Sequence, residues 1–230
     1  MISFSSKIAR LAVSLLNAKH DDVIVEIGPG HGELTKFIPD CNLILIEKDE
    51  ALLKEIKIKS AKKIHGDGVE NIKRRDFDCL ISSVPYAICE PLIRELFLHN
   101  FKKAVLILPE NFTKRLENNE TSLSFLAKEL LDIKTIMKIG REKFEPSPRV
   151  DSLLVEIKRR KGNALIEKMC LQLTKKTKNA LAEAFADVNG LTKKEARAAV
   201  EKMGISKRAL EKTVRMLSYH ELKYIKDTTK

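Results

Sequence analysis

The sequence lacks long hydrophobic runs. The longest, residues 104–109, is far shorter than the roughly 20 apolar residues that cross a bilayer. The first residues also lack an uninterrupted hydrophobic segment followed by a small-residue cleavage site, so they do not form a signal peptide pattern. These absences exclude the membrane and secreted classes, and we expect a cytoplasmic protein.

Cysteine is scarce and scattered. The four cysteines, Cys41, Cys79, Cys89 and Cys170, form no C-x-x-C pair, which argues against a zinc site and a disulfide framework. We expect four buried thiols and no metal site. Internal repeats and low-complexity tracts are also absent, and 43% apolar with 33% charged residues is typical of a folded chain with a full core.

The positive charge is unevenly distributed. Residues 1–158 carry 25 basic and 24 acidic side chains, whereas residues 159–230 carry 18 and 8. A neutral first part with a basic tail is typical of a catalytic module joined to a polyanion-binding module. A solvated lysine-rich surface explains the charge alone equally well.

Seven short β-rich segments alternate with helical patterns up to residue 158, which predicts parallel strands joined by helical crossovers. The segments are residues 23–27, 43–47, 63–65, 77–82, 104–108, 133–139 and 153–157. Between them, residues 8–16 and 88–97 show one-faced helical spacing. We predict an α/β, Rossmann-like domain over residues 1–158 with a seven-stranded, mostly parallel sheet.

The strand pattern stops after residue 158. Residues 159–163 read as a linker, and residues 159–230 as a small all-α domain. Thr192 and Ser206 are predicted helix N-caps, the former with Glu195 at the capping-box position. Gly190 and Gly204 stand where helix C-caps are expected.

The first strand runs into residues 26–35, an E-x-G-x-G-x-G turn that is expected to open a helix. Glycines let the chain turn sharply and let a ligand lie against bare backbone. The spacing differs from the G-x-G-x-x-G of dinucleotide sites, which favours S-adenosylmethionine over NAD. Taken alone, the glycines fit a tight structural turn equally well.

Acidic residues follow the next two strands. Glu47 lies 19 residues after Gly28, close to the spacing expected for an acid that binds ribose hydroxyls. Asp67 follows the third strand, where it can accept from the adenine amine of the cofactor. Successive parallel strands end at one edge of a sheet, so these acids are predicted to share one site.

Ser83-Val84-Pro85-Tyr86 follows the fourth strand. Ser83 and a carbonyl of Val84 or Pro85 can bind the hydrogens of an exocyclic adenine amine and orient its lone pair towards a methyl donor. Tyr86 offers a face to an extruded base, and Phe144 is expected on its other side. The alternatives are a simple strand-to-helix turn and a core phenylalanine.

Together these residues resemble the KsgA/Dim family of ribosomal RNA adenine dimethyltransferases, whose relatives include the Erm methylases. Residues 26–35 look like the family's E-I-G-P-G-x-G-x-L-T, and residues 144–152 like its F-x-P-x-P-x-V-x-S. Residues 46–49 and Gly66-Asp67 are similar to its two acidic elements. In the tail, residues 175–181 resemble its R-K-x-x-x-N-x-L helix and residues 215–218 its R-x-x-L-S segment.

The resemblance implies a class I S-adenosylmethionine-dependent enzyme that dimethylates two adjacent adenines near the 3′ end of small-subunit ribosomal RNA. The expected partner is the pre-30S particle, and we expect a monomer. The implied catalytic residues are Ser83, Pro85, Tyr86 and Phe144. The implied cofactor-binding residues are Glu26, Gly28, Gly30, Gly32, Glu47, Lys48, Asp67, Gly68 and Ser83. The implied RNA-binding residues are Lys175, Lys176, Lys178 and Arg149.

The sequence departs from this family at two places. Ser83 stands where members usually carry Asn, although the wider class of adenine-amine methyltransferases accepts Asp, Asn or Ser there. The G-Q-N/H-F-L segment expected at the start is reduced to residues 1–4, of which only Phe4 corresponds. These departures leave a non-catalytic ribosome assembly factor as the main alternative, and a small-molecule methyltransferase as a third.

Overall fold

The computed structural model describes residues 3–58 and 60–229 and divides into two compact units. The first unit comprises the chain up to Lys114 together with Asp132–Arg159. The second comprises Arg115–Leu131 and the chain from Arg160 onward. The assignment of residues 1–158 to catalysis and 159–230 to RNA binding stays a prediction.

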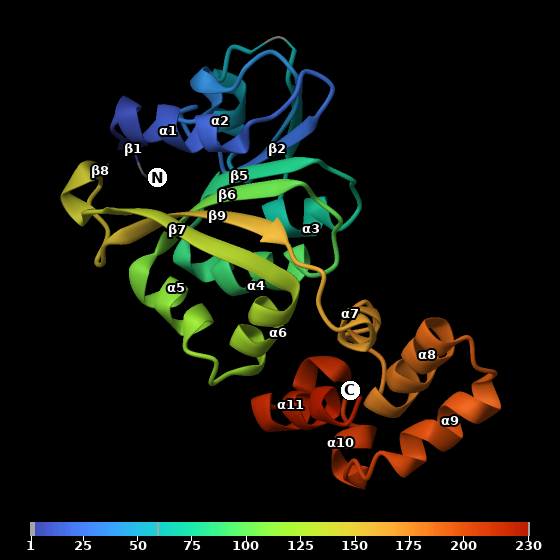
Figure 1. Cartoon of the computed structure of the whole chain (residues 1–230). Helices are drawn as coiled ribbons and strands as arrows, with labels where there is room; N and C mark the ends of the chain where they lie inside the picture. Colours follow the sequence, from blue (N-terminus) through green and yellow to red (C-terminus); the bar gives the residue numbers. More distant parts are fainter. Residues whose placement is uncertain (1–2, 59, 230) are drawn as a thin grey trace. The chain divides into compact units, whose positions relative to one another are not determined.

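A seven-stranded sheet forms the centre of the first unit, with the order β4-β3-β2-β5-β6-β9-β7 (Figure 1). The strands are β2 (Val23–Ile27), β3 (Asn42–Glu47), β4 (Lys62–His65), β5 (Cys79–Ser83), β6 (Lys103–Pro109), β7 (Leu131–Ile139) and β9 (Ser152–Arg159). The first five are parallel, and β9 runs antiparallel to β6. The predicted mostly parallel sheet is confirmed.

Helices cover both faces of this sheet, which explains why its central strands are almost continuously apolar. Figure 1 shows α1 (Ser6–Leu16) and α2 (Glu50–Glu55) on one face and α3 (Gly68–Ile72) and α4 (Tyr86–Leu96) on the other. Ile24, Leu45 and Leu80 are completely buried between these layers. The apolar stripe predicted for α1 faces the core, except for Leu11, which is exposed.

The strand order creates a crevice at one edge of the sheet. The chain passes outward from β2 through β3 to β4 and then returns to β5, which pairs with the other side of β2. Ligands of such sheets bind outside the carboxyl ends of the strands where the order reverses. The site is therefore expected beyond Ile27 and Ser83.

Two short strands form a separate pair near this edge. β1 (Ser3–Phe4) lies antiparallel to β8 (Phe144–Glu145), with Phe4 opposite Phe144 in the register. β8 follows the short 3₁₀ helix η2 (Arg141–Lys143). Of the four N-terminal residues singled out in the sequence, Met1 and Ile2 lie outside the described residues.

The second unit is helical, as predicted. Its elements are α6 (Ser122–Leu130), α7 (Ala164–Cys170), α8 (Thr177–Asn189), α9 (Lys193–Lys202), α10 (Lys207–Glu211), η3 (Val214–Met216) and α11 (Tyr219–Asp227), and α5 (Glu110–Glu117) crosses the boundary between the units. Thr192 and Glu195 form the predicted capping box, and Ser206 caps α10. Gly190 and Gly204 have φ angles of 65° and 67°, as the predicted helix ends require.

The predicted linker is shorter than expected. Arg159 is the last residue of β9, and Asn163 is the N-cap of α7, where its side chain accepts from the backbone of Leu165 and Ile166. Asn163 therefore belongs to the start of α7, because its side chain satisfies helix N–H groups. Arg159 belongs to β9, so residues 160–162 remain as the linker. Within the second unit, Lys226 pairs with Glu129 at 2.5 Å, which attaches α6 to the C-terminal helix.

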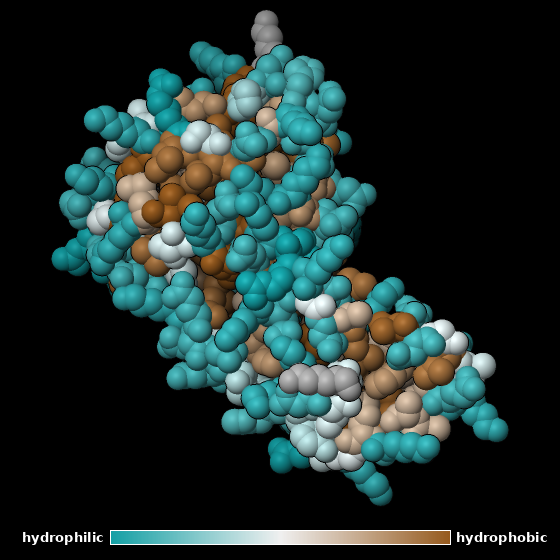
Figure 2. Space-filling model, in the orientation of Figure 1, coloured by the Kyte–Doolittle hydropathy of each residue, from teal (hydrophilic) through white to brown (hydrophobic). Residues whose placement is uncertain are grey.

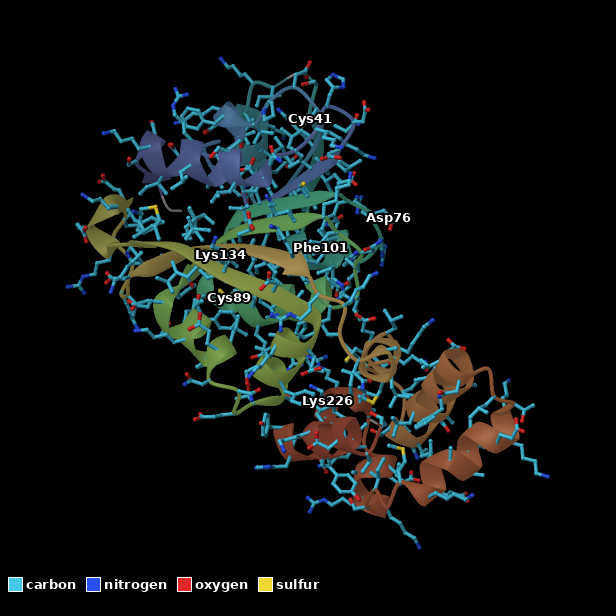
Figure 3. The ribbon with its side chains drawn as sticks, in the orientation of Figure 1. Cys41, Asp76, Cys89, Phe101, Lys134 and Lys226 are labelled. Carbon is cyan, nitrogen blue, oxygen red and sulfur yellow. The ribbon has the colours of Figure 1, made fainter. Side chains whose placement is uncertain are left out.

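The four cysteines are free, and no two of them lie on the same element. Cys79, Cys89 and Cys170 are buried, as predicted, but Cys41 is half-buried because it lies in the loop before β3. Figure 3 shows Cys41 and Cys89 far apart in the first unit. None of the helices within residues 3–58 and 60–229 has the length and apolar character needed to cross a bilayer.

Candidate active site

The glycine turn beyond β2 is shaped by positive φ angles. Gly28, Gly30 and Gly32 have φ values of 66°, 56° and 81°, which L side chains rarely adopt. The turn leads into the 3₁₀ helix η1 (Thr35–Phe37) instead of the expected α-helix. The helix stops because Ile38 precedes Pro39, and the residue before proline is driven to extended conformations.

A cavity of about 390 Å³ lies against this turn, within the size range of cofactor sites. It is bounded by three segments that follow strands of the sheet, as the strand-tip argument predicts. Its lining residues are Glu26, Gly28, Pro29, Gly30, Glu33, Leu34, Glu47, Asp49, Leu52, Ser83 and Pro85. Five of the nine residues predicted to bind the cofactor therefore line this cavity, which we call the first cavity.

Glu47 lies at the centre of a ring of backbone donors. Its Oε2 accepts from the N–H of Gly30 at 3.1 Å, and its Oε1 accepts from Lys48 at 2.8 Å and Asp49 at 3.0 Å. Three N–H donors hold the carboxylate in one orientation at the end of β3. Oε2 keeps a further lone pair for a hydroxyl donor, whereas Oε1 already accepts two N–H groups.

Glu26 is a buried carboxyl with one unsatisfied oxygen. It is 1% exposed, and within the described residues its Oε2 has no hydrogen-bond partner. Burial raises the pKa of Glu26 to about 8, and the nearby charge of Glu47 adds to the rise. A buried acceptor without a partner inside a cavity is suited to a donor group on a bound molecule.

Four residues assigned to the cofactor do not line this cavity. Asp67 caps α3, because its Oδ1 accepts from the N–H of Glu70 at 3.0 Å. A Cβ on Gly68 would lie 2.3 Å from the Ile27 side chain, so Gly68 permits close packing of α3 on β2. Lys48 contributes its backbone N–H to Glu47, and Gly32 belongs to the turn. Cofactor contacts of these four stay predictions.

A second cavity, of about 450 Å³, lies beyond β5 and β6. Apolar and aromatic side chains dominate its wall. Its lining residues are Ser83, Val84, Pro85, Tyr86, Ile107, Pro109, Asn111, Phe144, Pro148, Arg149, Val150 and Ser152. In Figures 1 and 2, apolar side chains are exposed on the side of the first unit where β8 lies. Ser83 and Pro85 border both cavities, so the two spaces meet at the tip of β5.

The two acceptors predicted at this junction differ in availability. The Ser83 hydroxyl has no hydrogen-bond partner in the described part of the chain. The carbonyl of Pro85 accepts from Ile88 N at 3.0 Å and from Cys89 Sγ at 3.4 Å. Among the described residues, the Val84 carbonyl receives only the weak Cys89 thiol donor at 4.0 Å, so Val84 is the better second acceptor.

Tyr86 and Phe144 line the same cavity, but they differ in exposure. Tyr86 is 55% exposed at the start of α4, whereas Phe144 is 5% exposed in β8. Phe144 thus provides a fixed wall and Tyr86 an accessible face. Aromatic faces at such positions can stack on a nucleic acid base.

An ion-pair network that sequence reasoning missed supports the outer wall of the second cavity. Lys138 lies 2.8 Å from a carboxylate oxygen of Glu110 and 2.9 Å from one of Asp151. Asp151 also accepts from Arg141 N at 3.0 Å, and the Lys138 ammonium holds the pKa of Asp151 below its usual range. Asn111 was also missed, although it follows the carboxyl end of β6, where strand-tip reasoning applies.

The four residues predicted to bind RNA occupy two places. Arg149 lines the second cavity of the first unit. Lys175 pairs with Glu183 at 2.6 Å, and Lys176 and Lys178 pair with Glu211 at 2.7 Å and 2.5 Å. Each of the three lysines is thus already paired, although Lys176 and Lys178 share one carboxylate.

A metal site is not apparent. Across residues 3–58 and 60–229, no three His, Cys, Asp or Glu side chains gather as ligands of a metal ion. The polar groups of both cavities are carboxylates, hydroxyls, amides and backbone groups. They are suited to hydrogen bonding with an organic ligand.

Comparison with known proteins identifies a family that matches this chain. The ribosomal RNA adenine dimethylase family matches residues 4–227. A protein of Pyrococcus furiosus named "Probable ribosomal RNA small subunit methyltransferase A" is 32% identical over 211 residues, which cover 87% of this chain and 74% of that protein. The protein of the same name from Thermococcus sibiricus is 31% identical over 160 residues, 65% of this chain and 58% of that protein.

A solved structure shows the same fold. A dimethyladenosine transferase from Plasmodium falciparum is similar with a TM-score of 0.67 and 21% identity, and the match covers 100% of this chain and 98% of that one. Because the match extends through both units, it includes the helical second unit as well as the sheet.

Proposed function

The chain belongs to the ribosomal RNA adenine dimethylase family, and from this premise we propose that it transfers methyl groups from S-adenosylmethionine to the N6 amine of adenines in small-subunit ribosomal RNA. The observation that carries the proposal is the junction of two cavities at Ser83 and Pro85. One cavity has the polar groups that a nucleoside cofactor needs, and the other has an aromatic wall suited to a base.

The first cavity fits S-adenosylmethionine, the methyl donor of this family. Glu47 would bind the ribose, since its backbone donors already fix its orientation and Oε2 has a lone pair left for a hydroxyl. The partnerless Oε2 of Glu26 is suited to the cationic amino group of the methionine part. The bound cofactor supplies an activated methyl group on a positively charged sulfur.

Ser83 and the Val84 carbonyl would orient the target amine. The lone pair of an adenine amine is delocalised into the ring, so the nitrogen is a poor nucleophile. Two acceptors that bind its hydrogens favour tetrahedral geometry and point the lone pair towards the first cavity. The bound methyl donor would supply the carbon to this nitrogen, and the amine proton would leave to solvent, so no dedicated base is required.

Tyr86 and Phe144 would hold the base. An adenine must leave its stack to reach Ser83, and stacking on aromatic side chains offsets part of the cost of extrusion. The exposed face of Tyr86 and the fixed wall of Phe144 are suited to the two sides of the ring. Arg149 lines the same cavity and would contact a flanking phosphate.

The substrate is proposed in more detail from the family resemblance. We propose two adjacent adenines near the 3′ end of the small-subunit RNA, each converted to N6,N6-dimethyladenine in the pre-30S particle during assembly. The second unit would bind RNA, and the protein would act as a cytoplasmic monomer. The excess of 18 basic over 8 acidic residues in 159–230 supports the RNA-binding role.

Mapping modified nucleotides in cells tests the proposed position. Dimethylated adenines block Watson–Crick pairing, so reverse transcription of small-subunit RNA should stop at two adjacent adenines in normal cells. The stops should vanish in cells lacking the protein and return when wild type, but not Ser83→Ala, is supplied. Stops that persist without the protein would refute the assignment. If the Ser83→Ala variant restores assembly but not the stops, an additional assembly role follows.

A further inference from the structure

The charges of the second unit are distributed differently from what the sequence indicates. The basic run at residues 175–178 is most prominent in the sequence, but each of its three lysines pairs with a carboxylate. By contrast, Lys193, Lys194, Arg197 and Lys202 of α9 form no ion pair or side-chain hydrogen bond within the described residues. Within the described part of the second unit, α9 therefore carries four unpaired cations, whereas α10 carries two, Lys207 and Arg208.

The fold of α9 directs these cations outward. Ala196 and Val200 are buried and face the interior of the unit, whereas Lys193 and Arg197 are exposed. Residues four apart lie on one face of a helix, with Cβ atoms about 5–6 Å apart. Lys193 and Arg197 thus form a pair of neighbouring positive charges one turn apart.

Lys193 and Arg197 line a groove between α8 and α9. Its lining residues are Lys175, Asn179, Ala182, Glu183, Ala186, Asp187, Lys193 and Arg197. The two carboxylates among them are compensated, because Glu183 pairs with Lys175 at 2.6 Å and Asp187 with Lys168 at 3.4 Å. α8 and α9 lie side by side in Figure 1, so the groove runs between two helices of the same unit.

We propose that the α8–α9 groove is a binding track for the phosphate backbone of RNA, with Lys193 and Arg197 as its principal contacts and the Asn179 amide as an uncharged donor. The proposal rests on the RNA-methylating function proposed above and names the surface that performs its RNA binding. Arg forms forked hydrogen bonds with phosphate, and Lys supplies a mobile point charge. Contact with unpaired cations disrupts no existing ion pair, unlike contact with Lys175, Lys176 or Lys178.

Salt dependence of RNA binding tests the groove. Each phosphate contact releases a counterion and contributes about 0.7–0.9 to the slope of log K against log salt concentration. The full-length Lys193→Ala/Arg197→Ala variant should therefore lower the magnitude of this slope by about 1.5 and weaken binding of a small-subunit RNA transcript at least tenfold at low salt. The swapped variant Lys193→Arg/Arg197→Lys should keep the wild-type slope.

Lys194→Ala/Lys202→Ala is the matched control, because it removes two cations of the same helix that do not line the groove. Its slope should stay close to that of the wild type. If the two double variants lose RNA affinity and slope equally, the proposed groove is wrong and RNA contacts a diffuse basic surface. If the alanine pair unfolds the second unit, Lys193→Gln/Arg197→Gln carries the same expectation.

The two proposals fail in different ways. A wild type that binds the transcript with no salt dependence would refute the RNA-binding role assigned to the second unit, whatever the variants do. A wild type with a steep slope that is unchanged by the groove variant would refute the groove alone. Equal S-adenosylmethionine affinity in all forms would show that the first unit is intact.

Discussion

Gly30 donates its backbone N–H to Glu47 Oε2 at 3.1 Å, which links the glycine turn after β2 to the acid at the end of β3. The two residues are far apart in the sequence and meet because their parallel strands end at one edge of the sheet. The contact orients the carboxylate before any ligand binds. A preoriented acceptor loses little conformational entropy on binding, which favours affinity.

Replacing Glu47 should weaken cofactor binding. Glu47→Ala removes the ribose acceptor and leaves three backbone N–H groups without their partner. We expect the dissociation constant for S-adenosylmethionine to rise at least tenfold in isothermal titration calorimetry. Glu55→Gln, at an exposed position outside the cavity, is the control. Comparable affinities in wild type and Glu47→Ala would disprove the ribose assignment.

Replacing Ser83 should affect transfer more than binding. Ser83→Ala removes one of two acceptors that orient the amine, so kcat should fall by about 100-fold, as is typical for loss of one preorganised polar group. The affinity for S-adenosylmethionine should change only modestly. Ser83→Asn retains an acceptor oxygen and should keep measurable transfer. A Ser83→Ala enzyme with wild-type kcat would exclude the proposed orientation of the amine.

Lys138 should act as a positioning residue for the base cavity. Its ammonium joins Glu110 at the start of α5 to Asp151 before β9, and residues of both segments line the cavity. Lys138→Met should raise KM for RNA several-fold without changing the affinity for S-adenosylmethionine. Lys138→Arg keeps the charge and should restore KM. If the methionine variant shows the wild-type KM, the network does not position this wall.

Glu26 should make the ligand-free protein less stable as pH rises. Its pKa is raised by burial from 4.5 to about 8. Between these values the folded protein retains a proton that the unfolded chain has lost, so this group lowers the free energy of unfolding by about 1.4 kcal/mol per pH unit. Glu26→Gln should therefore gain stability relative to the wild type at pH 8 but not at pH 4.5.

Denaturant titrations at these two pH values measure the effect, with the exposed Glu145→Gln as control. If the free energy of unfolding of Glu26→Gln differs from that of the wild type by the same amount at both pH values, the elevated pKa of Glu26 is wrong. In addition, a cationic ligand beside Glu26 favours the ionised carboxyl, so binding of S-adenosylmethionine near pH 7 should release a proton. Calorimetry in two buffers of different ionisation enthalpy detects this release.

Strand-tip reasoning from the sequence located much of the site. Alternation of apolar strands with helical patterns predicts parallel order, and parallel order brings Glu26, Glu47 and Ser83 to one edge. The first cavity indeed has all three in its wall. The expected α-helix after the glycine turn is a 3₁₀ helix instead, because Pro39 drives Ile38 to an extended conformation.

Features that depend on distant pairing could not be predicted. Lys176 and Glu211 are 35 residues apart, and only the folded helices show that they neutralise each other. Lys138 likewise meets Asp151 across a loop whose path the sequence does not define. The unsatisfied oxygen of Glu26 also emerges only from packing, because sequence patterns do not reveal which buried atoms lack a partner.

Nucleoside mass spectrometry after a reaction in vitro tests the central claim most directly. Purified protein would be incubated with methyl-labelled S-adenosylmethionine and immature small subunits, and the digested RNA analysed for methylated adenosine. We expect labelled N6,N6-dimethyladenosine with the wild type and its loss with Ser83→Ala. Bound cofactor without any labelled adenosine would contradict this expectation, and would leave the protein as an assembly factor that retains the fold.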